Sequence, residues 1–272
     1  MFSKMLGAMS VAKAGETIKG LGFDGVDLTV RPQGHVLPEN VRRDLPEAVK
    51  TLKGIGLSVP MLTTAVTDAS EPHAEDVFAT AAQCGVKRLK LGYWRYDGFG
   101  KLHEQMNVVR KLLVGLERLA LKHGVVAGIH THSGPFMSAH AGVVHLLMKD
   151  TDPKAICAYV DPGHLTVEGG YRGWQIGLDL LSGRIGMVAV KDFGWFQEAP
   201  GQKKWKHKLV PLCEGMVPWP DVFKHLRQVG FDGPVSVHSE YQGSHSFRDL
   251  TVEQLIEQTR QDVAYLRQAM RA

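Results

Sequence analysis

The chain has 272 residues, 44% of them hydrophobic and 22% charged, with a formal net charge of +4 at pH 7. This length and composition suit one large α/β domain, and the mild charge without a long Lys or Arg run argues against nucleic acid as a partner. No segment approaches the ~18 apolar residues of a membrane span, and 3 widely spaced cysteines argue against a disulfide framework.

The beginning of the chain bears on localisation. Residues 1–10 lack the apolar stretch of a secretory signal, so we expect a cytoplasmic protein. Residues 2–6 look like the end of a first strand, with almost no residues before it. On this pattern we expect that a natural protein would have a segment upstream of residue 1.

Hydrophobic periodicity, capping residues and Gly or Pro punctuation predict a regular alternation of strands and helices. The predicted strands cover residues 2–6, 25–30, 57–63, 88–92, 125–131, 155–160, 185–191 and 234–239. The predicted helices cover residues 11–21, 38–55, 72–84, 104–123, 139–149, 171–182, 219–229 and 252–270. Such alternation requires parallel strands with helical crossovers and predicts a (β/α)8 TIM barrel, a single domain over residues 1–272. An open doubly wound sheet is disfavoured because no Gly-rich dinucleotide fingerprint follows an early strand.

The segment 193–215 is longer than an ordinary connection between a strand and a helix. Loops over ~12–15 residues are often lids or binding loops, and this one carries Trp195 and Trp205. We therefore expect the segment to cover part of the barrel mouth as a lid.

Histidines recur at the ends of predicted strands, and in a TIM barrel those positions share one mouth. Because alternate residues of a strand point to opposite faces, periodicity selects the residues that point inward. The inward set comprises Asp27, Arg31, His130, His132, Asp161, Lys191, His238 and Glu240, with His164 just beyond.

So many titratable groups in one mouth are costly to desolvate unless they are paired or bound to an ion. Imidazoles and carboxylates that converge from separate strands are ordinary ligands for Mn²⁺, Zn²⁺ or Co²⁺. The candidate metal ligands are Asp161, His132, His238 and Glu240. Each could instead be a buried side chain satisfied by hydrogen bonds, and the residues leave that alternative open.

Several motifs are shared with one family of barrels. They are Gly22-Phe23-Asp24-Gly25-Val26-Asp27-Leu28, the His-Ser-Gly of residues 132–134, Asp161-Pro162-Gly163-His164, Val190-Lys191-Asp192, Glu214-Gly215-Met216-Val217 and Ser239-Glu240. In these motifs the chain resembles the sugar phosphate isomerase/epimerase, or xylose-isomerase-like, TIM barrels over nearly its whole length. Residues 29–35 look like a subgroup of that family described only as isomerases.

Members of this family bind a divalent metal through a Glu, an Asp, a His and a Glu from the fifth to the eighth strand. The resemblance carries this pattern over to Asp161 and Glu240. It fails at His130, where the first Glu is expected, and at Ala189, where the His is expected. Either a different set of the inward histidines and carboxylates holds Mn²⁺, Co²⁺, Mg²⁺ or Zn²⁺, or the site has lost the metal.

The resemblance implies a sugar isomerase or epimerase that moves a proton next to a carbonyl with help from the metal. Glu240 is then the base or a ligand, Lys191 supplies positive charge to the developing oxyanion, and His164 shuttles protons. The candidate substrate-binding residues are Arg31, His35, Trp94, Arg95, His130 and Trp195.

Two other functions fit the same residues. A lyase or hydratase acting on a keto-sugar also removes a proton next to a carbonyl. A non-catalytic barrel would bind a carbohydrate without turnover. In each case the expected partner is a small-molecule carbohydrate, and because barrels of this family often form homodimers, a second copy of the chain is another.

Overall fold

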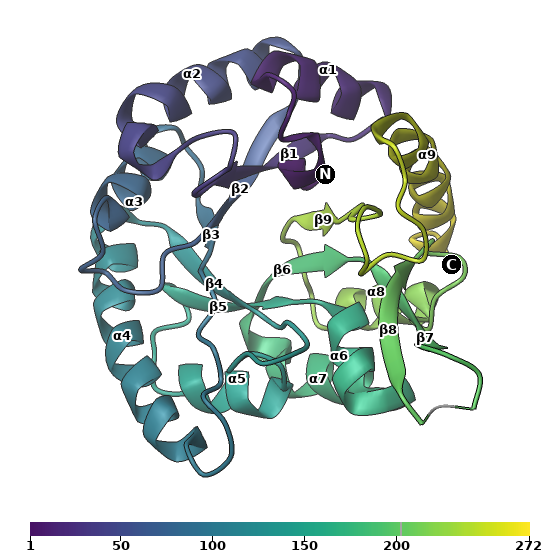
Figure 1. The fold of residues 1–272 in the computed structure, drawn as a ribbon. Helices are drawn as coiled ribbons and strands as arrows, with labels where there is room; N and C mark the ends of the chain where they lie inside the picture. Colours follow the sequence, from purple (N-terminus) through teal and green to yellow (C-terminus); the bar gives the residue numbers. More distant parts are fainter. Residues whose placement is uncertain (202) are drawn as a thin grey trace.

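Parallel strands form the inner wall of the molecule, and helices surround them (Figure 1). The computed structural model describes residues 1–201 and 203–272. Within these residues, a 7-stranded parallel sheet has the order β1-β2-β3-β4-β5-β6-β9, and β7 and β8 form a separate antiparallel pair. The barrel fold expected from the sequence is therefore confirmed.

The elements have the following bounds. The strands are β1 (Gly25–Val30), β2 (Ser58–Thr64), β3 (Arg88–Lys90), β4 (Val126–His130), β5 (Ile156–Val160), β6 (Ile185–Val190), β7 (Asp192–Gln197), β8 (Trp205–Val210) and β9 (Val235–Val237). The α-helices are α1 (Val11–Gly20), α2 (Val41–Gly54), α3 (Ala74–Gln83), α4 (Leu102–His123), α5 (Ala141–Met148), α6 (Pro162–Gly169), α7 (Gly173–Leu181), α8 (Trp219–Gln228) and α9 (Val252–Ala269). Short 3-10 helices are η1 (Ser3–Leu6), η2 (Pro38–Asn40), η3 (Gly170–Arg172) and η4 (Ser182–Arg184).

The first two residues join β1 to β9 and so complete the barrel wall. Phe2 forms a parallel bridge with Asp27 of β1, and its backbone N–H donates to the Val237 carbonyl of β9 at 3.0 Å. The strand expected over residues 2–6 is wrong beyond Phe2, since the next four residues form η1. The Ser3 hydroxyl, rather than a backbone carbonyl, accepts an N–H of β1 at 3.1 Å, and the chain then turns away from the sheet.

The helix expected over residues 171–182 is preceded by a helix that the sequence did not predict, α6. It begins after Asp161, whose carboxylate accepts the His164 N–H at 3.0 Å and caps the first turn. It ends at Gly169, and the next residue, Gly170, has a φ of +67°, a conformation that glycine adopts without strain. The segment after β5 is therefore two short helices, and the first of them is anchored on a predicted site residue.

The segment 193–215, expected to be a long loop, contains an antiparallel hairpin of β7 and β8 among its described residues. The alternation of lysines with Trp205, His207 and Leu209 is the period-two pattern of a strand. Phe193 at the base of the hairpin is 4% exposed, whereas Trp205 is 56% exposed. A lid function for this hairpin stays a prediction.

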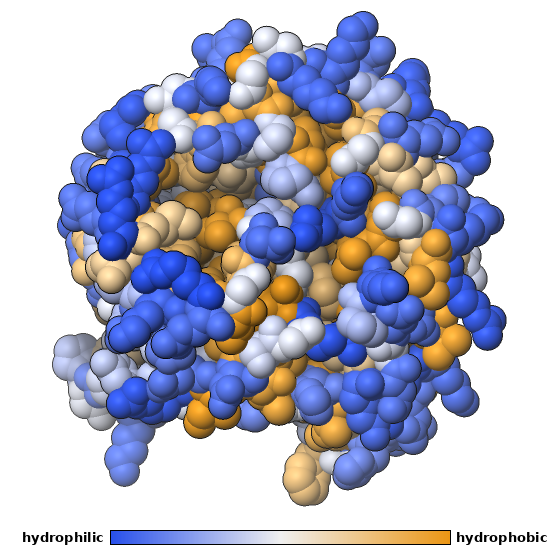
Figure 2. Space-filling model, turned by 180° about the vertical axis from the view of Figure 1, so that it is seen from behind, coloured by the Kyte–Doolittle hydropathy of each residue, from blue (hydrophilic) through white to orange (hydrophobic). Residues whose placement is uncertain are grey.

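Figure 2 shows the face of the molecule opposite to that in Figure 1. Hydrophilic residues occupy most of its outline, and hydrophobic residues gather toward its middle. In the described part of the chain, no helix has both the length and the apolar character needed to cross a membrane.

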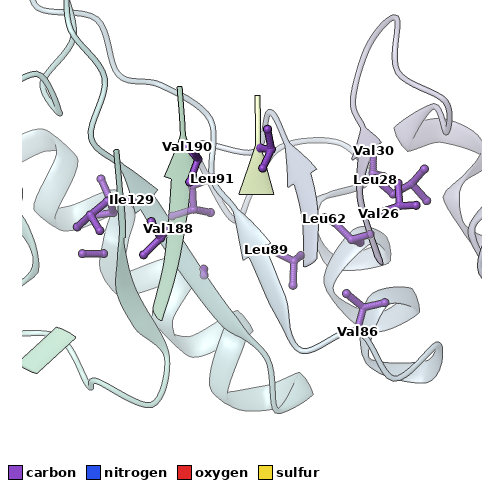
Figure 3. Packing of buried hydrophobic residues seen from close by; sticks show 14 of the residues in the cluster. Val26, Leu28, Val30, Leu62, Val86, Leu89, Leu91, Ile129, Val188 and Val190 are labelled. Atoms are coloured by element: carbon purple, nitrogen blue, oxygen red, sulfur yellow. The ribbon is translucent and has the colours of Figure 1, made fainter. Parts of the chain in front are cut away.

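Apolar side chains fill the space between the barrel wall and the helices. Leu28, Leu62 and Val188 are among the strand residues of this layer in Figure 3. A smaller cluster consists of Met61, Cys157, Tyr159, Met187 and Ala189, which alternate with outward-facing residues of their strands and so fill the barrel interior. Gly128 leaves room for this cluster, because a Cβ there would lie 2.1 Å from Met187 Cε.

Candidate active site

The carboxyl ends of the barrel strands surround a polar cavity of about 90 Å³. It is lined by Phe2, Lys4, Arg31, Thr63, Lys90, Tyr93, His130, His132, Tyr159, Lys191, His238 and Glu240. A larger hollow of about 310 Å³ lies at the amino ends of the strands, lined by Gly25 and Pro234 among others. Catalytic groups of TIM barrels lie at the carboxyl ends, so the smaller, more charged cavity is the candidate site.

The Lys191 ammonium lies between two buried carboxylates. Its Nζ is 3.1 Å from Oε2 of Glu240 and 3.6 Å from Oδ2 of Asp161. Burial alone would lower the pKa of Lys191, but the Glu240 and Asp161 carboxylates hold it above its ordinary value. Lys191 is therefore a fixed positive charge in the cavity.

Glu240 is held in its ionised form from two sides. Its Oε1 accepts from Lys4 at 2.5 Å, and its Oε2 accepts from Lys191. Burial would raise the pKa of Glu240, but the charge of Lys191, a contact with His238 and the charge of Lys4 hold it well below its ordinary value. The Lys4 side chain is 40% exposed, so its contact is more screened and easier to displace than that of Lys191.

A hydrogen-bonded chain links Asp161, His130 and Tyr93. His130 Nε2 lies 3.3 Å from Asp161 Oδ2, and its Nδ1 lies 2.7 Å from the Tyr93 hydroxyl. Burial raises the pKa of Asp161 and the charge of Lys191 opposes this rise. Burial and Lys191 both lower the pKa of His130 well below its ordinary value. With Asp161 ionised, neutral His130 donates through Nε2 and accepts the Tyr93 O–H at Nδ1, so the chain can pass a proton.

His132 and His164 lie against each other, with ring centroids 3.9 Å apart. His132 Nδ1 carries a proton, because its partner at 2.9 Å is the Ser133 carbonyl oxygen, which can only accept. Burial and Lys191 lower the pKa of His132 to about 2, so its Nε2 presents a lone pair. His164 Nδ1 lies 2.7 Å from the Ser133 hydroxyl, and its buried Nε2 has no hydrogen-bond partner among the described residues.

His238 connects the barrel closure to the site. Its ring stacks on Phe2 at 4.4 Å between centroids, and its Nε2 lies 2.8 Å from the Tyr159 hydroxyl. Burial lowers the pKa of His238, and its Nδ1 lies 3.8 Å from Glu240 Oε2. His238 is therefore held by Phe2 and Tyr159, and its Nδ1 has no hydrogen-bond partner among the described residues.

The arrangement does not fit a divalent metal ion. The sequence predicts the ligands His132, Asp161, His238 and Glu240. The Lys191 ammonium lies between the two carboxylates of that set and would repel a second cation beside it. Ala189, where the family pattern places a histidine, is buried in the barrel interior. In the part of the chain that the structure describes, no three His, Cys, Asp or Glu side chains are placed to hold a metal ion.

Two of the predicted substrate-binding residues line the cavity, namely Arg31 and His130. His35 lies outside the cavity lining. Its Nδ1 is 3.2 Å from the Thr29 hydroxyl, and its Nε2 is 3.2 Å from the Leu6 carbonyl oxygen. His35 therefore holds η1 against β1, a role in positioning the chain near Lys4.

The predicted aromatic residues lie farther from the cavity. Trp94 and Arg95 line a separate hollow of about 480 Å³ beside α4. Trp195 projects from β7, where it is 42% exposed and its ring lies 5.6 Å from that of His207. A contact of these residues with substrate stays a prediction.

Six residues of the cavity lining were missed by the sequence reasoning: Phe2, Lys4, Thr63, Lys90, Tyr93 and Tyr159. Strand periodicity could have identified Lys90, because its neighbours Leu89 and Leu91 belong to the outer apolar layer. Tyr159 alternates with outward residues in the same way. The positions of Lys4 and Tyr93 depend on chain segments outside the strands, for which periodicity gives no signal.

The model of the xylose isomerase-like TIM barrel family matches residues 16–269. A solved L-ribulose 3-epimerase has a TM-score of 0.74 at 15% identity, with 100% of this chain and 93% of that chain covered. The probable 3-DHS dehydratase AsbF from Bacillus anthracis has a TM-score of 0.69 at 14% identity, with 97% of each chain covered. A xylose isomerase-like TIM barrel protein from Mycobacterium smegmatis, in complex with magnesium, has a TM-score of 0.65 at 15% identity, with 95% and 89% covered. No curated protein sequence matches the chain.

Proposed function

The chain belongs to the xylose isomerase-like TIM barrel family, and from this premise we propose that it is a sugar isomerase or epimerase that moves a proton next to a carbonyl. The observation that carries the proposal is the contact of Lys191 with Glu240 at 3.1 Å in the cavity. Proton abstraction next to a carbonyl needs a base for the proton and a positive group for the oxyanion. Lys191 and Glu240 supply both in one place.

In the proposed reaction, the carbonyl oxygen of an open-chain sugar lies against Lys191. As the proton leaves the adjacent carbon, negative charge develops on that oxygen and the ammonium stabilises it. Loss of one such contact typically lowers turnover by about 10²–10³. Glu240 takes the proton, since its carboxylate is ionised at neutral pH. Lys4, the more exposed partner of Glu240, gives way as the sugar enters.

The neutral histidines of the cavity suit a substrate rich in hydroxyl groups. His132 Nε2 can accept a substrate O–H, and the guanidinium of Arg31 can donate to a substrate oxygen. The chain from Tyr93 through His130 to Asp161 can exchange the hydroxyl proton that an isomerase moves between neighbouring oxygens.

A dehydratase acting on a keto-sugar is the second candidate, and the Tyr93 hydroxyl favours it. Proton removal next to the carbonyl gives the same enolate in both reactions. A dehydratase then protonates a departing hydroxyl group, and Tyr93, with His130 at 2.7 Å, is a donor on the cavity wall. The two reactions differ only in the fate of the enolate.

Incubation with a series of sugars and keto-sugars in D₂O tests the proposal. An isomerase or epimerase yields a product with the substrate's formula that carries deuterium, whereas a dehydratase product has lost water. Glu240→Gln should abolish turnover while sugar binding, measured by calorimetry, survives. The exposed Glu104→Gln on α4 serves as the control and should retain activity. Sugar binding without turnover or deuterium exchange would instead identify a non-catalytic carbohydrate-binding barrel.

A further inference from the structure

Lys90, the last residue of β3, is a buried lysine of the cavity that the proposed proton transfer does not use. It is 3% exposed, and its Nζ lies 3.5 Å from the centroid of the Tyr93 ring. Asp27, whose charge reaches it, accepts hydrogen bonds from Thr63 and Ser236 at 2.8 Å each. The Asp27 carboxylate is thus hydrogen-bonded to two hydroxyl groups, and among the described residues no carboxylate forms a salt bridge with Lys90.

The charges around Lys90 favour the neutral amine. Burial is the largest influence and lowers the pKa of Lys90 well below its ordinary value. The positive charges of Arg31 and Lys191 lower it further, while Asp27 and Glu240 oppose them. The pKa values of the two cavity lysines are thus shifted in opposite directions, since two carboxylates raise that of Lys191 and burial lowers that of Lys90. A neutral lysine amine in a buried cavity is the usual activated nucleophile toward a carbonyl.

We propose that Lys90 Nζ attacks the carbonyl carbon of the substrate and forms a protonated Schiff base. This inference rests on the proposed function for the kind of substrate, a sugar with an open-chain carbonyl. In this covalent route the iminium takes the place of the carbonyl oxygen stabilised by Lys191 as the group that acidifies the neighbouring C–H, and Glu240 keeps its role as the base. The Tyr93 ring lies where the iminium cation would form, and a cation over an aromatic face is stabilised.

The atoms of the step balance. The lone pair of the amine forms the C–N bond, and the carbonyl oxygen takes one proton from the nitrogen, which gives a carbinolamine. A second proton, from solvent, lets that oxygen leave as water, and the C=N⁺ bond forms with one proton left on nitrogen. The iminium acidifies the neighbouring C–H, and loss of that proton to Glu240 gives an enamine. In an epimerase the same carbon takes a proton back on its opposite face, which restores the iminium. Addition of water to the iminium and loss of the amine then return the carbonyl and free Lys90.

Reductive trapping with dihydroxyacetone and sodium cyanoborohydride tests the proposal without any turnover assay. The small probe suits a cavity of about 90 Å³, on the order of three water volumes. Peptide mapping should find the mass of the probe less one oxygen atom on the Lys90 peptide at pH 7. Trapping there should be about 100-fold faster than at Lys111, because Lys111 lies on the exposed surface, where water favours the charged ammonium that cannot attack a carbonyl.

Two variants test whether Lys90 is the residue that forms the adduct. Lys90→Met should remove the fast adduct, and the matched surface variant Lys111→Met should keep it. The mapping on the unmodified chain stands even where Lys90→Met fails to fold. Absence of an adduct on the Lys90 peptide, or a rate there no faster than at Lys111, overturns the inference.

Different results would contradict the Schiff base at Lys90 and the proposed isomerase or epimerase activity. Turnover with deuterium exchange but no adduct at Lys90 would overturn the covalent step and leave the proton transfer intact. A fast adduct at Lys90 without turnover of any sugar would support the nucleophile and overturn the proposed isomerase.

Discussion

Replacing Lys191 by methionine removes the positive charge between Glu240 and Asp161. With N–O distances of 3.1 and 3.6 Å and an effective dielectric of about 20, each attraction is roughly 5 kcal/mol. Desolvation of the three groups offsets much of this sum. We therefore expect the free energy of unfolding at pH 7 to fall by about 3–5 kcal/mol, the usual loss when one partner of a buried ion pair is removed.

Urea denaturation of the two proteins measures this loss, provided that the denaturant slope is unchanged. Lys4→Met is the matched control, because it removes the other lysine on Glu240. The Lys4 side chain is 40% exposed, so its loss should be under about 1 kcal/mol. The reasoning is refuted if Lys191→Met is as stable as the unmodified chain, or if Lys4→Met loses more.

The difference between Lys191→Met and the unmodified chain should shrink in acid. The folded-state pKa of Glu240 lies well below its ordinary value of 4.5. Its stabilisation is therefore fully present above about pH 4.5 and is lost as the pH falls through the folded value. Because the variant lacks that stabilisation, the two unfolding free energies should converge below about pH 4.5. A difference that stays constant down to pH 3 would contradict the assignment of the ion pair.

Three other changes test separate parts of the structure. Turnover of a sugar should be unaffected by EDTA, because Lys191 lies where a cation would bind; a loss that Mg²⁺ restores would contradict this. Tyr93→Phe keeps the ring and removes the proton donor to His130, so kcat should fall about 10²-fold with an unchanged circular dichroism spectrum. Gly128→Ala should cost about 1–3 kcal/mol in urea denaturation, since its Cβ would lie 2.1 Å from Met187 Cε. Gly183→Ala, with nothing within 4 Å, is the control and should cost less.

Periodicity alone predicted much of the barrel mouth. It placed His130, Lys191, His238 and Glu240 at strand ends and pointed them inward, and all four line the cavity. This works because a strand in a closed barrel has only two faces, and the outer face must be apolar to pack against helices. The same rule applied to β3 would have included Lys90.

Other features depend on contacts between distant segments. The Lys191 ammonium lies between Asp161 and Glu240, which follow different strands, so only the closed barrel reveals that a cation already occupies the space between them. The end of the first strand likewise depends on the Ser3 hydroxyl replacing a backbone acceptor for β1. Neither feature has a signal in hydrophobic periodicity, which reports burial and not the identity of a partner.

The two cavity lysines are also coupled, which gives the site one further testable property. Lys191 is among the positive charges that lower the pKa of Lys90, while Glu240 raises it. Lys191→Met removes the first influence and frees Glu240 from its main partner, so the pKa of Lys90 should rise. Reductive trapping at Lys90 should then slow at pH 7 and recover at higher pH, whereas Lys4→Met should change it less because Lys4 is more exposed. If Lys191→Met trapped the probe at an unchanged rate, the charge of Lys191 would have no part in keeping Lys90 neutral, and burial alone would account for its reactivity.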